Sequence, residues 1–236
     1  MQIDAHDLSA FYEAPMGQVT RRLISRRIRK LWPSAPGLRI LGYGFAPPYL
    51  APYLAESERA IALMPAQQGV AAWPGGRPLS VLGEENALPF PDAMFDRILM
   101  VHAVEAADAA RPLMRQIWRV LAPGGRLIVI APNRASLWAR VERSPFGHGR
   151  PFTRRQLAKL LGESMFAPER WDTALFFPPL PTRWIARDGA SWERIGRVLW
   201  PRLAGVHIVE ASKSLYASPQ VAVAKNSKTS LAEVSG

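Results

Sequence analysis

Two glycines separated by one residue, in Gly42-Tyr43-Gly44, directly follow a short apolar run. Glycine lets a backbone turn approach a ligand closely, and the amide groups at the start of a following helix can point at the polar end of that ligand. The apolar run at 38–41 and the prolines at 47–48 predict a strand before the turn and a helix after it. Strand, glycine turn and helix together form the first candidate ligand site.

A second stretch whose residues could take part in binding or catalysis is 145–152, which reads Pro-Phe-Gly-His-Gly-Arg-Pro-Phe. Its glycines could bring the backbone close to a ligand, His148 could exchange a proton, and Arg150 could hold an anionic group. An ordinary loop capping a strand explains the same prolines and glycines equally well. His102, which directly follows an apolar run, leaves a similar choice open between a catalytic base and a structural histidine.

Five short apolar runs alternate with helical patterns along the first half of the chain. The runs lie at 38–41, 60–64, 79–82, 95–101 and 126–130. Their β-branched and aliphatic residues are typical of buried parallel strands. Such alternation predicts a doubly wound parallel sheet with right-handed crossovers, whose ligand sites lie at the carboxyl ends of the strands.

Further helical and strand patterns flank this region. Residues 7–32 have apolar residues at helical spacing with basic residues between them. Such a helix either packs its apolar face on the domain or lies on a membrane or RNA, and packing is the commoner case. Later in the chain, Thr153 begins a helix at 154–161, and strand-like patterns at 170–177 and 205–216 predict a hairpin at the sheet edge.

Length and composition favour a single domain. The chain has 236 residues, of which 48% are hydrophobic and 21% charged, as in globular proteins. We expect one domain over 1–217, with a helical segment at 1–36, an insertion at 134–190 and a disordered tail at 218–236. Without cysteine, and with four scattered histidines, the chain has no disulfide, and we expect no metal site.

The formal net charge is +11. This charge is compatible with nucleic acid, an acidic partner or anionic lipid headgroups, and equally with a solvated basic surface. No apolar run approaches the roughly 20 residues that span a bilayer, and the first ten residues lack the pattern of a signal peptide. We therefore expect a cytoplasmic protein.

Two longer stretches identify a family resemblance. Residues 87–96 read Ala-Leu-Pro-Phe-Pro-Asp-Ala-Met-Phe-Asp, and residues 118–127 read Trp-Arg-Val-Leu-Ala-Pro-Gly-Gly-Arg-Leu. They resemble the L-P-F-x-D-x-x-F-D and R-V-L-K-P-G-G signatures of class I S-adenosylmethionine-dependent methyltransferases of the ubiquinone-biosynthesis type, in matching order after the glycine turn. The resemblance covers 38–133, and 145–152 is similar to a segment of a proteobacterial branch of such proteins. It implies a Rossmann-like α/β fold with a doubly wound, mostly parallel seven-stranded sheet, an antiparallel last strand and helices on both faces.

The resemblance also implies S-adenosylmethionine as the cofactor, held at the carboxyl ends of the first strands. The residues that it places there are Gly42, Tyr43, Gly44, Met64, Glu84, Glu85 and Val101. The glycine turn would pass beneath the methionine part, and the two glutamates would lie near the adenine, although glutamates in a polar turn are as often simply solvated. Val101 and His102 would line the methyl-transfer face.

Two positions depart from the family pattern. The third glycine of the family's G-x-G-x-G is replaced by Ala46, a small residue that the turn can tolerate. The acid that usually ends the second strand and binds the ribose hydroxyls is absent, because that strand ends Leu63-Met64-Pro65. Losing two hydroxyl-to-carboxylate hydrogen bonds would cost on the order of a few kcal/mol of binding unless another residue compensates.

Methyl transfer needs an aligned nucleophile and, for a protonated nucleophile, a base. His102 and His148 are the candidate catalytic residues, and Arg150 is the candidate substrate-binding residue. The aromatic and arginine-rich stretch at 138–184 would form the pocket of a small or lipid-like acceptor. The alternatives are a catalytically silent methyltransferase-like partner protein and an RNA methyltransferase, with a dinucleotide-dependent dehydrogenase less favoured than either.

Overall fold

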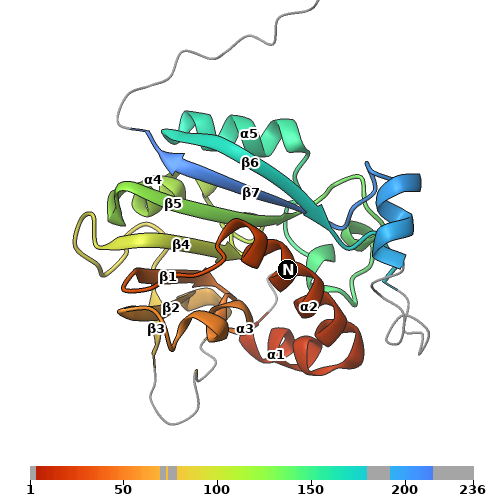
Figure 1. Cartoon of the computed structure of the whole chain (residues 1–236), viewed down its shortest axis with the longest axis horizontal. Helices are drawn as coiled ribbons and strands as arrows, with labels where there is room; N and C mark the ends of the chain where they lie inside the picture. The colour runs from red at the N-terminus through yellow and green to blue at the C-terminus, as the bar shows by residue number, and fades with distance from the viewer. Residues whose placement is uncertain (1–3, 70–72, 74–78, 180–191, 215–236) are drawn as a thin grey trace, which may run out of the picture.

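A single seven-stranded sheet organises the chain (Figure 1). The computed structural model describes residues 4–69, 73, 79–179 and 192–214. The strands are β1 (Arg39–Gly44), β2 (Arg59–Pro65), β3 (Ser80–Gly83), β4 (Phe95–Val101), β5 (Leu121–Pro132), β6 (Phe166–Ala174) and β7 (Val206–Lys213). They lie in the order β3-β2-β1-β4-β5-β7-β6. Strands β1 to β5 are parallel, and β7 is antiparallel to both β5 and β6, so the predicted fold class and edge hairpin are confirmed.

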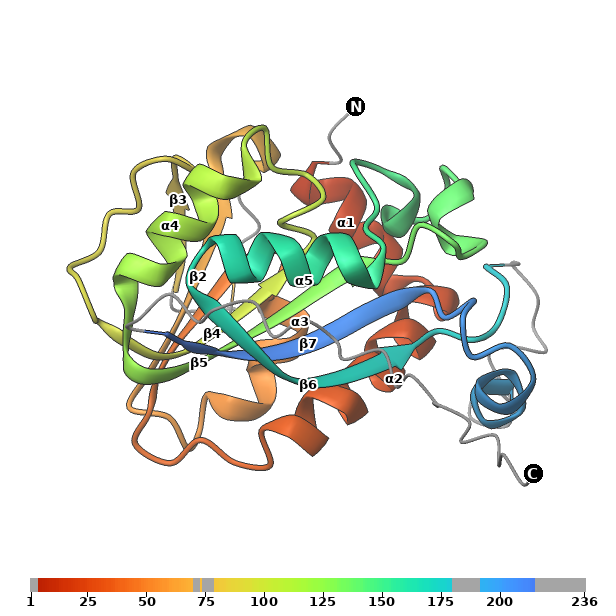
Figure 2. The same ribbon diagram turned by 90° about the horizontal axis from the view of Figure 1, so that it is seen from above.

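Helices cover both faces of this sheet, as Figure 2 shows edge-on. The helices are α1 (Ala5–Glu13), α2 (Pro15–Leu31), α3 (Pro47–Leu50), α4 (Ala110–Val120) and α5 (Arg154–Glu163), with short 3-10 turns η1 (Ala51–Tyr53), η2 (Ala66–Gln68), η3 (Trp138–Arg140) and η4 (Pro145–Gly147). Residues 192–199 are also helical. One apolar core lies between the sheet and α2 and α3, and the other lies between the sheet and α4 and α5.

The helical pattern predicted over 7–32 is in fact two helices. Pro15 occupies the first turn of α2, a position where its missing N–H costs nothing. Gly17 lets the helices cross closely, because a Cβ there would lie 1.9 Å from the carbonyl oxygen of Phe11. The prediction of one continuous helix was wrong because Pro15 was not read as a helix start. The break directs α1 toward the carboxyl ends of the strands.

The two stretches that carry the family signatures are fastened to each other and to the sheet. Arg119 donates from its guanidinium to the carbonyl oxygens of Leu88 at 2.9 Å and Phe90 at 2.8 Å. Asp96 accepts two hydrogen bonds from the guanidinium of Arg39, each at 3.0 Å. These polar signature residues hold the loop before β4 in place. Their hydrogen bonds therefore stabilise the fold.

The region after β5 is only partly described. Thr153 and Gln156 form a reciprocal capping box at the start of α5, which confirms the predicted helix start. The predicted tail at 218–236, residues 180–190 of the predicted insertion and the end of the predicted strand at 215–216 lie outside the described residues.

Candidate active site

Two cavities lie beyond the carboxyl ends of the parallel strands. The smaller, of about 170 Å³, is lined among others by Leu8, Gln68, His102, Glu105, His148 and Arg150. The larger, of about 310 Å³, is lined among others by Pro65, Gln67, Gly83, Glu84, Glu85 and Asp108. Gln67 lines one cavity and Gln68 the other, so η2 separates them, whereas Asp108 borders both.

His102 lies in a buried chain of hydrogen bonds. Tyr49 donates from its hydroxyl to the Tyr12 hydroxyl at 2.9 Å, and Tyr12 Oη lies 2.8 Å from His102 Nε2. Burial raises the pKa of both tyrosines well above the usual range, so both remain hydrogen-bond donors. This order of donation makes His102 Nε2 an acceptor and leaves the proton on Nδ1.

The backbone at His102 is unusual as well. Its φ of +51° lies in the left-handed region, which a residue with a side chain adopts at a cost of about 1–3 kcal/mol. Gln68 donates from its side-chain amide to the carbonyl oxygen of His102 at 3.0 Å. The ring of Phe146 lies 4.7 Å from the imidazole, centroid to centroid. Contacts from three separate segments therefore keep the imidazole beside the smaller cavity.

Glu105 is the least expected member of this site. His102 Nδ1 lies 3.5 Å from Glu105 Oε1, and the glutamate is 4% exposed. Neither carboxylate oxygen accepts a hydrogen bond from a described residue. A buried carboxylate is costly unless a charge or donor accompanies it. Glu105 is therefore suited to a cationic or hydrogen-bond-donating ligand group in the cavity that it lines.

The predicted loop at 145–152 reaches the same cavity. His148 Nε2 lies 2.6 Å from the carbonyl oxygen of Glu142, and both His148 and Arg150 line the cavity. Gly149 has a φ of +74°, and a Cβ there would lie 2.3 Å from the carbonyl oxygen of Glu105. The glycine thus lets the loop lie directly on the segment that follows β4. The structure brings the three predicted residues His102, His148 and Arg150 together.

The structure places Gly42, Tyr43 and Gly44 in the last part of β1, so the predicted turn begins only at Phe45, and protein contacts fill the space around the glycines. A Cβ on Gly44 would lie 2.3 Å from the carbonyl oxygen of Val101, and that oxygen accepts a hydrogen bond from the Phe45 amide at 2.8 Å. The ring of Tyr12 stacks on that of Phe45, with centroids 5.6 Å apart. A Cβ on Gly42 would collide with the side chain of α3 residue Leu50, at 2.5 Å. Both glycines are therefore required for packing.

The other residues predicted at this turn are buried. Tyr43 points into the core under α4, where its hydroxyl has no hydrogen-bond partner among the described residues, and burial raises its pKa. Met64 and Val101 lie in the core on the opposite face. These residues do not line the two cavities described above, and their roles in cofactor binding stay predictions.

The turn after β3 is open by comparison. Glu84 is exposed and Glu85 is half-buried at the larger cavity. Glu85 accepts a hydrogen bond from the Asp108 amide at 3.2 Å, and Gln67 donates to Asp108 Oδ2 at 2.9 Å. Burial raises the pKa of Glu85. Three carboxylates thus gather at one edge of a chain whose formal charge is +11.

A basic groove of about 600 Å³ lies on the other side of the smaller cavity, between α4 and α5. Its basic residues are Arg111, Arg115, Arg134, Arg150 and Lys159. Glu163 pairs with two of them, Arg111 at 2.7 Å and Lys159 at 3.7 Å. Arg150 borders both this groove and the smaller cavity, so acidic and basic surfaces meet at the histidines.

Sequence reasoning missed Tyr12, Gln68 and Glu105. Glu105 follows His102 by three residues, a spacing that could have indicated it. Tyr12 is 90 residues away from His102, and no local pattern connects the two. Among the described residues, no cluster of three metal-ligating side chains is present. In the same part of the chain, no helix is both long and apolar enough to cross a membrane.

Residues 41–129 match the family model of the methyltransferase domain. Two curated relatives are demethylmenaquinone methyltransferases. That of Thermus thermophilus is 31% identical over 140 residues, which are 57% of this chain and 56% of the relative. That of Deinococcus radiodurans is 31% identical over 109 residues, 44% of each. The chain therefore matches about half the length of these relatives.

Solved structures agree on the fold. A possible histamine N-methyltransferase from Thermotoga maritima has a TM-score of 0.58 at 18% identity, covering 88% of this chain and 94% of the other. A chain from the complex of the Haloferax volcanii Trm112 methyltransferase activator with a putative methyltransferase has a TM-score of 0.61 at 16% identity, covering 91% and 100%. The [4+2]-cyclase SpnF also matches, with a TM-score of 0.58 at 19% identity over 84% and 82%.

The sheet order and these solved structures show the fold of class I S-adenosylmethionine-dependent methyltransferases. Residues 41–129 thus match the methyltransferase-domain family, and the menaquinone-type relatives match over about half of the chain. The cofactor that this similarity implies is S-adenosylmethionine.

Proposed function

We propose that this protein transfers a methyl group from S-adenosylmethionine to a small or lipid-like acceptor that carries an anionic group. The observation that carries the proposal is the position of the smaller cavity. It places His102 and the carboxylate of Glu105 between an acid-lined cavity and a basic groove. A cationic cofactor would find carboxylates in the acid-lined cavity, and an anionic acceptor would find the basic residues of the groove, which Asp108 also borders.

The acid-lined cavity suits the cofactor. S-adenosylmethionine presents an ammonium group, a sulfonium and ribose hydroxyls, all of which favour carboxylates. Glu84, Glu85 and Asp108 border that cavity, and Glu105 offers a buried carboxylate at the next. We assign to Asp108 the ribose-binding role of the acid that β2 lacks. When bound, the cofactor supplies an electrophilic methyl group.

His102 is the proposed base for the acceptor. Nε2, which accepts the hydrogen bond from the Tyr12 hydroxyl, is the nitrogen that would take the acceptor's proton, and the Glu105 carboxylate near Nδ1 would stabilise the resulting imidazolium. His148 lines the same cavity and is the second candidate. Leu8 and Pro145 line the apolar side of this cavity and exclude water there, which strengthens the charge interactions inside.

The basic groove favours an acceptor with an anionic group. Arg150 borders both the groove and the smaller cavity, so it can hold an anionic group of a molecule whose reacting end lies at His102. The curated relatives named as demethylmenaquinone methyltransferases support an acceptor with a lipid-like part. An acceptor with an apolar ring and an acidic substituent fits both observations.

Calorimetric titration with S-adenosylmethionine and S-adenosylhomocysteine tests the cofactor side. We expect wild-type protein to bind both, and Asp108→Asn to bind about tenfold more weakly because a charged acceptor of ribose hydrogen bonds is lost. Glu58→Gln is the matched control, because Glu58 is an exposed acid just before the amino end of β2, far from the cavity. Wild-type protein that binds neither compound would overturn the proposal.

A second candidate is a catalytically silent methyltransferase-like partner protein. It is supported by Pro65 at the end of β2, where the family has an acid nearby, and by the closed glycine turn. One structural relative comes from a complex with an activator protein. Failure to bind cofactor without a partner, with binding restored by one, would favour this candidate over the independent enzyme. RNA methylation is a third candidate, supported only by the basic charge.

A further inference from the structure

The helix at 192–199 is attached to the domain by its polar residues. Glu193 is buried, and its carboxylate accepts hydrogen bonds from the amides of Leu175 at 3.2 Å and Phe176 at 2.9 Å. Arg27 of α2 lies 3.6 Å from the same carboxylate. Gly196 faces the protein too, since a Cβ there would lie 2.5 Å from the Phe176 side chain. The charged face of this helix therefore points inward.

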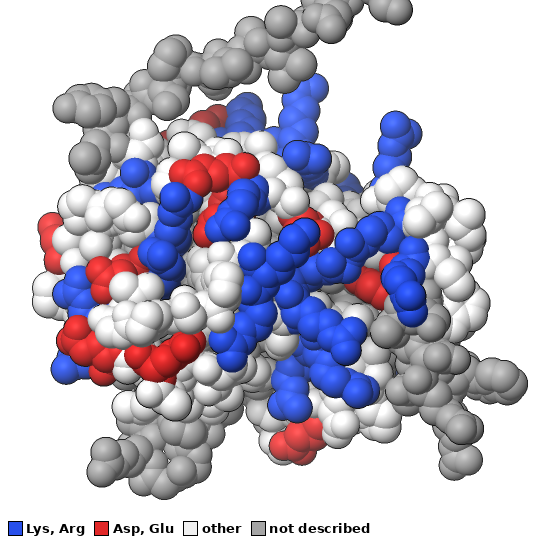
Figure 3. Space-filling view, viewed as in Figure 1, with Lys and Arg blue, Asp and Glu red and all other residues white. Residues whose placement is uncertain are grey.

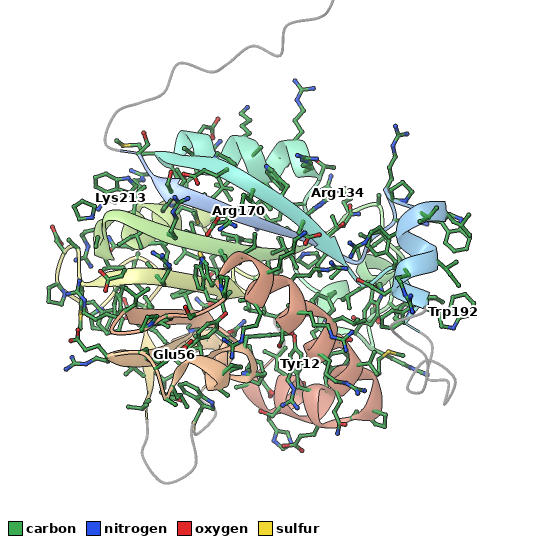
Figure 4. All side chains as sticks on the ribbon, viewed as in Figure 1. Tyr12, Glu56, Arg134, Arg170, Trp192 and Lys213 are labelled. Carbon is green, nitrogen blue, oxygen red and sulfur yellow. The ribbon has the colours of Figure 1, made fainter. Side chains whose placement is uncertain are left out.

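The opposite face is apolar and exposed. Trp192, Ile195 and Leu199 recur at helical spacing and are 43%, 47% and 60% exposed, and Val198 beside them is 79% exposed. Trp200 and Leu203 extend the same surface beyond the helix, each 46% exposed. Trp192 projects from the side of the helix that faces away from the sheet (Figure 4). A surface helix normally buries its apolar face, so this reversed arrangement marks an interaction surface.

The neighbouring surface is basic. Figure 3 shows Lys and Arg side chains gathered over α2 and continuing toward the helix at 192–199. The exposed basic residues of α2 are Arg21, Arg22, Arg26, Arg29 and Lys30. Arg194 and Arg202 are exposed beside the apolar residues themselves. The ion pair between Arg27 and Glu193 connects α2 to the helix at 192–199, so the basic surface and the apolar surface are adjacent.

We propose that the helix at 192–199 and the basic face of α2 together dock on an anionic lipid bilayer. Tryptophan and aliphatic side chains flanked by arginine are the composition of interfacial membrane helices. Each basic residue near an anionic bilayer adds to the electrostatic attraction. Four of the six exposed apolar residues, Ile195, Val198, Leu199 and Leu203, are aliphatic and give a nucleic acid nothing to stack on, so RNA is the weaker occupant even though the two tryptophans could stack. This surface is independent of methyl transfer.

Sedimentation with vesicles tests the proposal, using the full chain without cofactor. We expect binding to vesicles of phosphatidylcholine mixed with phosphatidylglycerol and weaker binding to phosphatidylcholine alone. Leu199→Asp combined with Val198→Asp should lower binding to the mixed vesicles about tenfold, since these side chains can no longer enter the interface. Arg22→Glu with Arg26→Glu should lower binding only to the anionic vesicles.

Leu82→Asp is the control, because Leu82 is 46% exposed on β3, at the opposite edge of the sheet. It should bind vesicles as wild type does, and the unfolding transitions of all variants should match that of wild type. Equal vesicle binding by Val198→Asp/Leu199→Asp and Leu82→Asp would overturn the proposal. So would wild-type binding to RNA with no binding to anionic vesicles. Cofactor titration of the same variants keeps this outcome separate from that of the proposed enzyme.

Discussion

The turns after β1 and β3 lie at the same edge of the sheet but serve different purposes. The space around the glycines at the end of β1 is filled by protein atoms, including the carbonyl oxygen of Val101, and the ring of Tyr12 covers Phe45 in the turn that follows. The turn after β3 is open, and Glu84 and Glu85 face a cavity of about 310 Å³. The comparison teaches that a residue typical of a ligand site can be needed for packing, while neighbours outside the motif face the ligand.

The largest effect is expected at the closed turn. Gly44 and Gly37 have φ values of +77° and +65°, so alanine is strained at both. Only at Gly44 would the new Cβ also meet protein, 2.3 Å from the Val101 carbonyl oxygen, whereas nothing lies within 4 Å at Gly37. We expect Gly44→Ala to lower the free energy of unfolding by about 3 kcal/mol or more, and Gly37→Ala by about 1 kcal/mol.

Denaturant unfolding of the two alanine variants measures the difference. Similar losses of stability at Gly44 and Gly37 would mean that the end of β1 has room for a side chain, as it would if its glycines faced a ligand. For the same reason, cofactor binding by a Gly44 variant reports on folding as much as on contact with the cofactor. Variants at the open turn separate the two effects.

The signature residue Arg119 should also act on stability. Its guanidinium satisfies the carbonyl oxygens of Leu88 and Phe90, so Arg119→Met should lower the free energy of unfolding by about 2 kcal/mol. Arg111 is the control, because its side chain is 64% exposed and pairs only with Glu163 among the described acids. Arg111→Met should change stability by less than about 0.5 kcal/mol. Thermal unfolding that ranks the two variants in reverse would contradict a packing role for the signature.

Two buried glutamates have different expected roles: Glu105 faces a ligand, and Glu210 stabilises the fold. Glu105 accepts no hydrogen bond from a described residue, whereas Glu210, which is 1% exposed, accepts one from Trp32 Nε1 at 2.9 Å and one from Arg170 at 2.5 Å. We expect Glu105→Gln to keep its stability within about 0.5 kcal/mol and to weaken cofactor binding about tenfold. Glu210→Gln should do the reverse, losing about 2 kcal/mol of stability with unchanged binding.

Unfolding and calorimetric titration of both glutamine variants give this comparison directly. Parallel losses of stability in the two variants would show that Glu105 is bonded within the protein. Loss of binding in Glu210→Gln would instead show that binding depends on general stability, since Glu210 lies on β7, away from the cavities.

The sequence predicts the strands and some helix ends well, because apolar runs and capping residues are local signals. Thr153 begins α5 as expected, and Pro15, a local signal of the same kind, begins α2, where the apolar spacing over 7–32 predicts one continuous helix. The site is harder, because it is assembled from distant segments. Tyr12 reaches His102 across 90 residues, which no spacing rule can anticipate. At Gly44 the sequence indicates that a side chain is excluded, and only the structure shows that Val101 excludes it.

The smallest effect concerns pH at the open turn. Burial raises the pKa of Glu85, so this carboxylate becomes protonated at a higher pH than an ordinary glutamate. A neutral Glu85 attracts a cationic cofactor less, so affinity should fall a few-fold as pH decreases through that raised pKa. Stability should move the other way, because the folded state of a group with a raised pKa holds its proton more tightly than the unfolded state does.

Titration of wild type, Glu85→Gln and Glu84→Gln over the same pH range separates these contributions. Glu85→Gln should show a flat affinity at the level of protonated wild type, whereas Glu84→Gln, altered at an exposed position, should keep the pH dependence. A wild-type slope retained in Glu85→Gln would assign the titration to a different group. Glu85 would then not contribute to cofactor affinity, and the contrast between the ends of β1 and β3 would not hold.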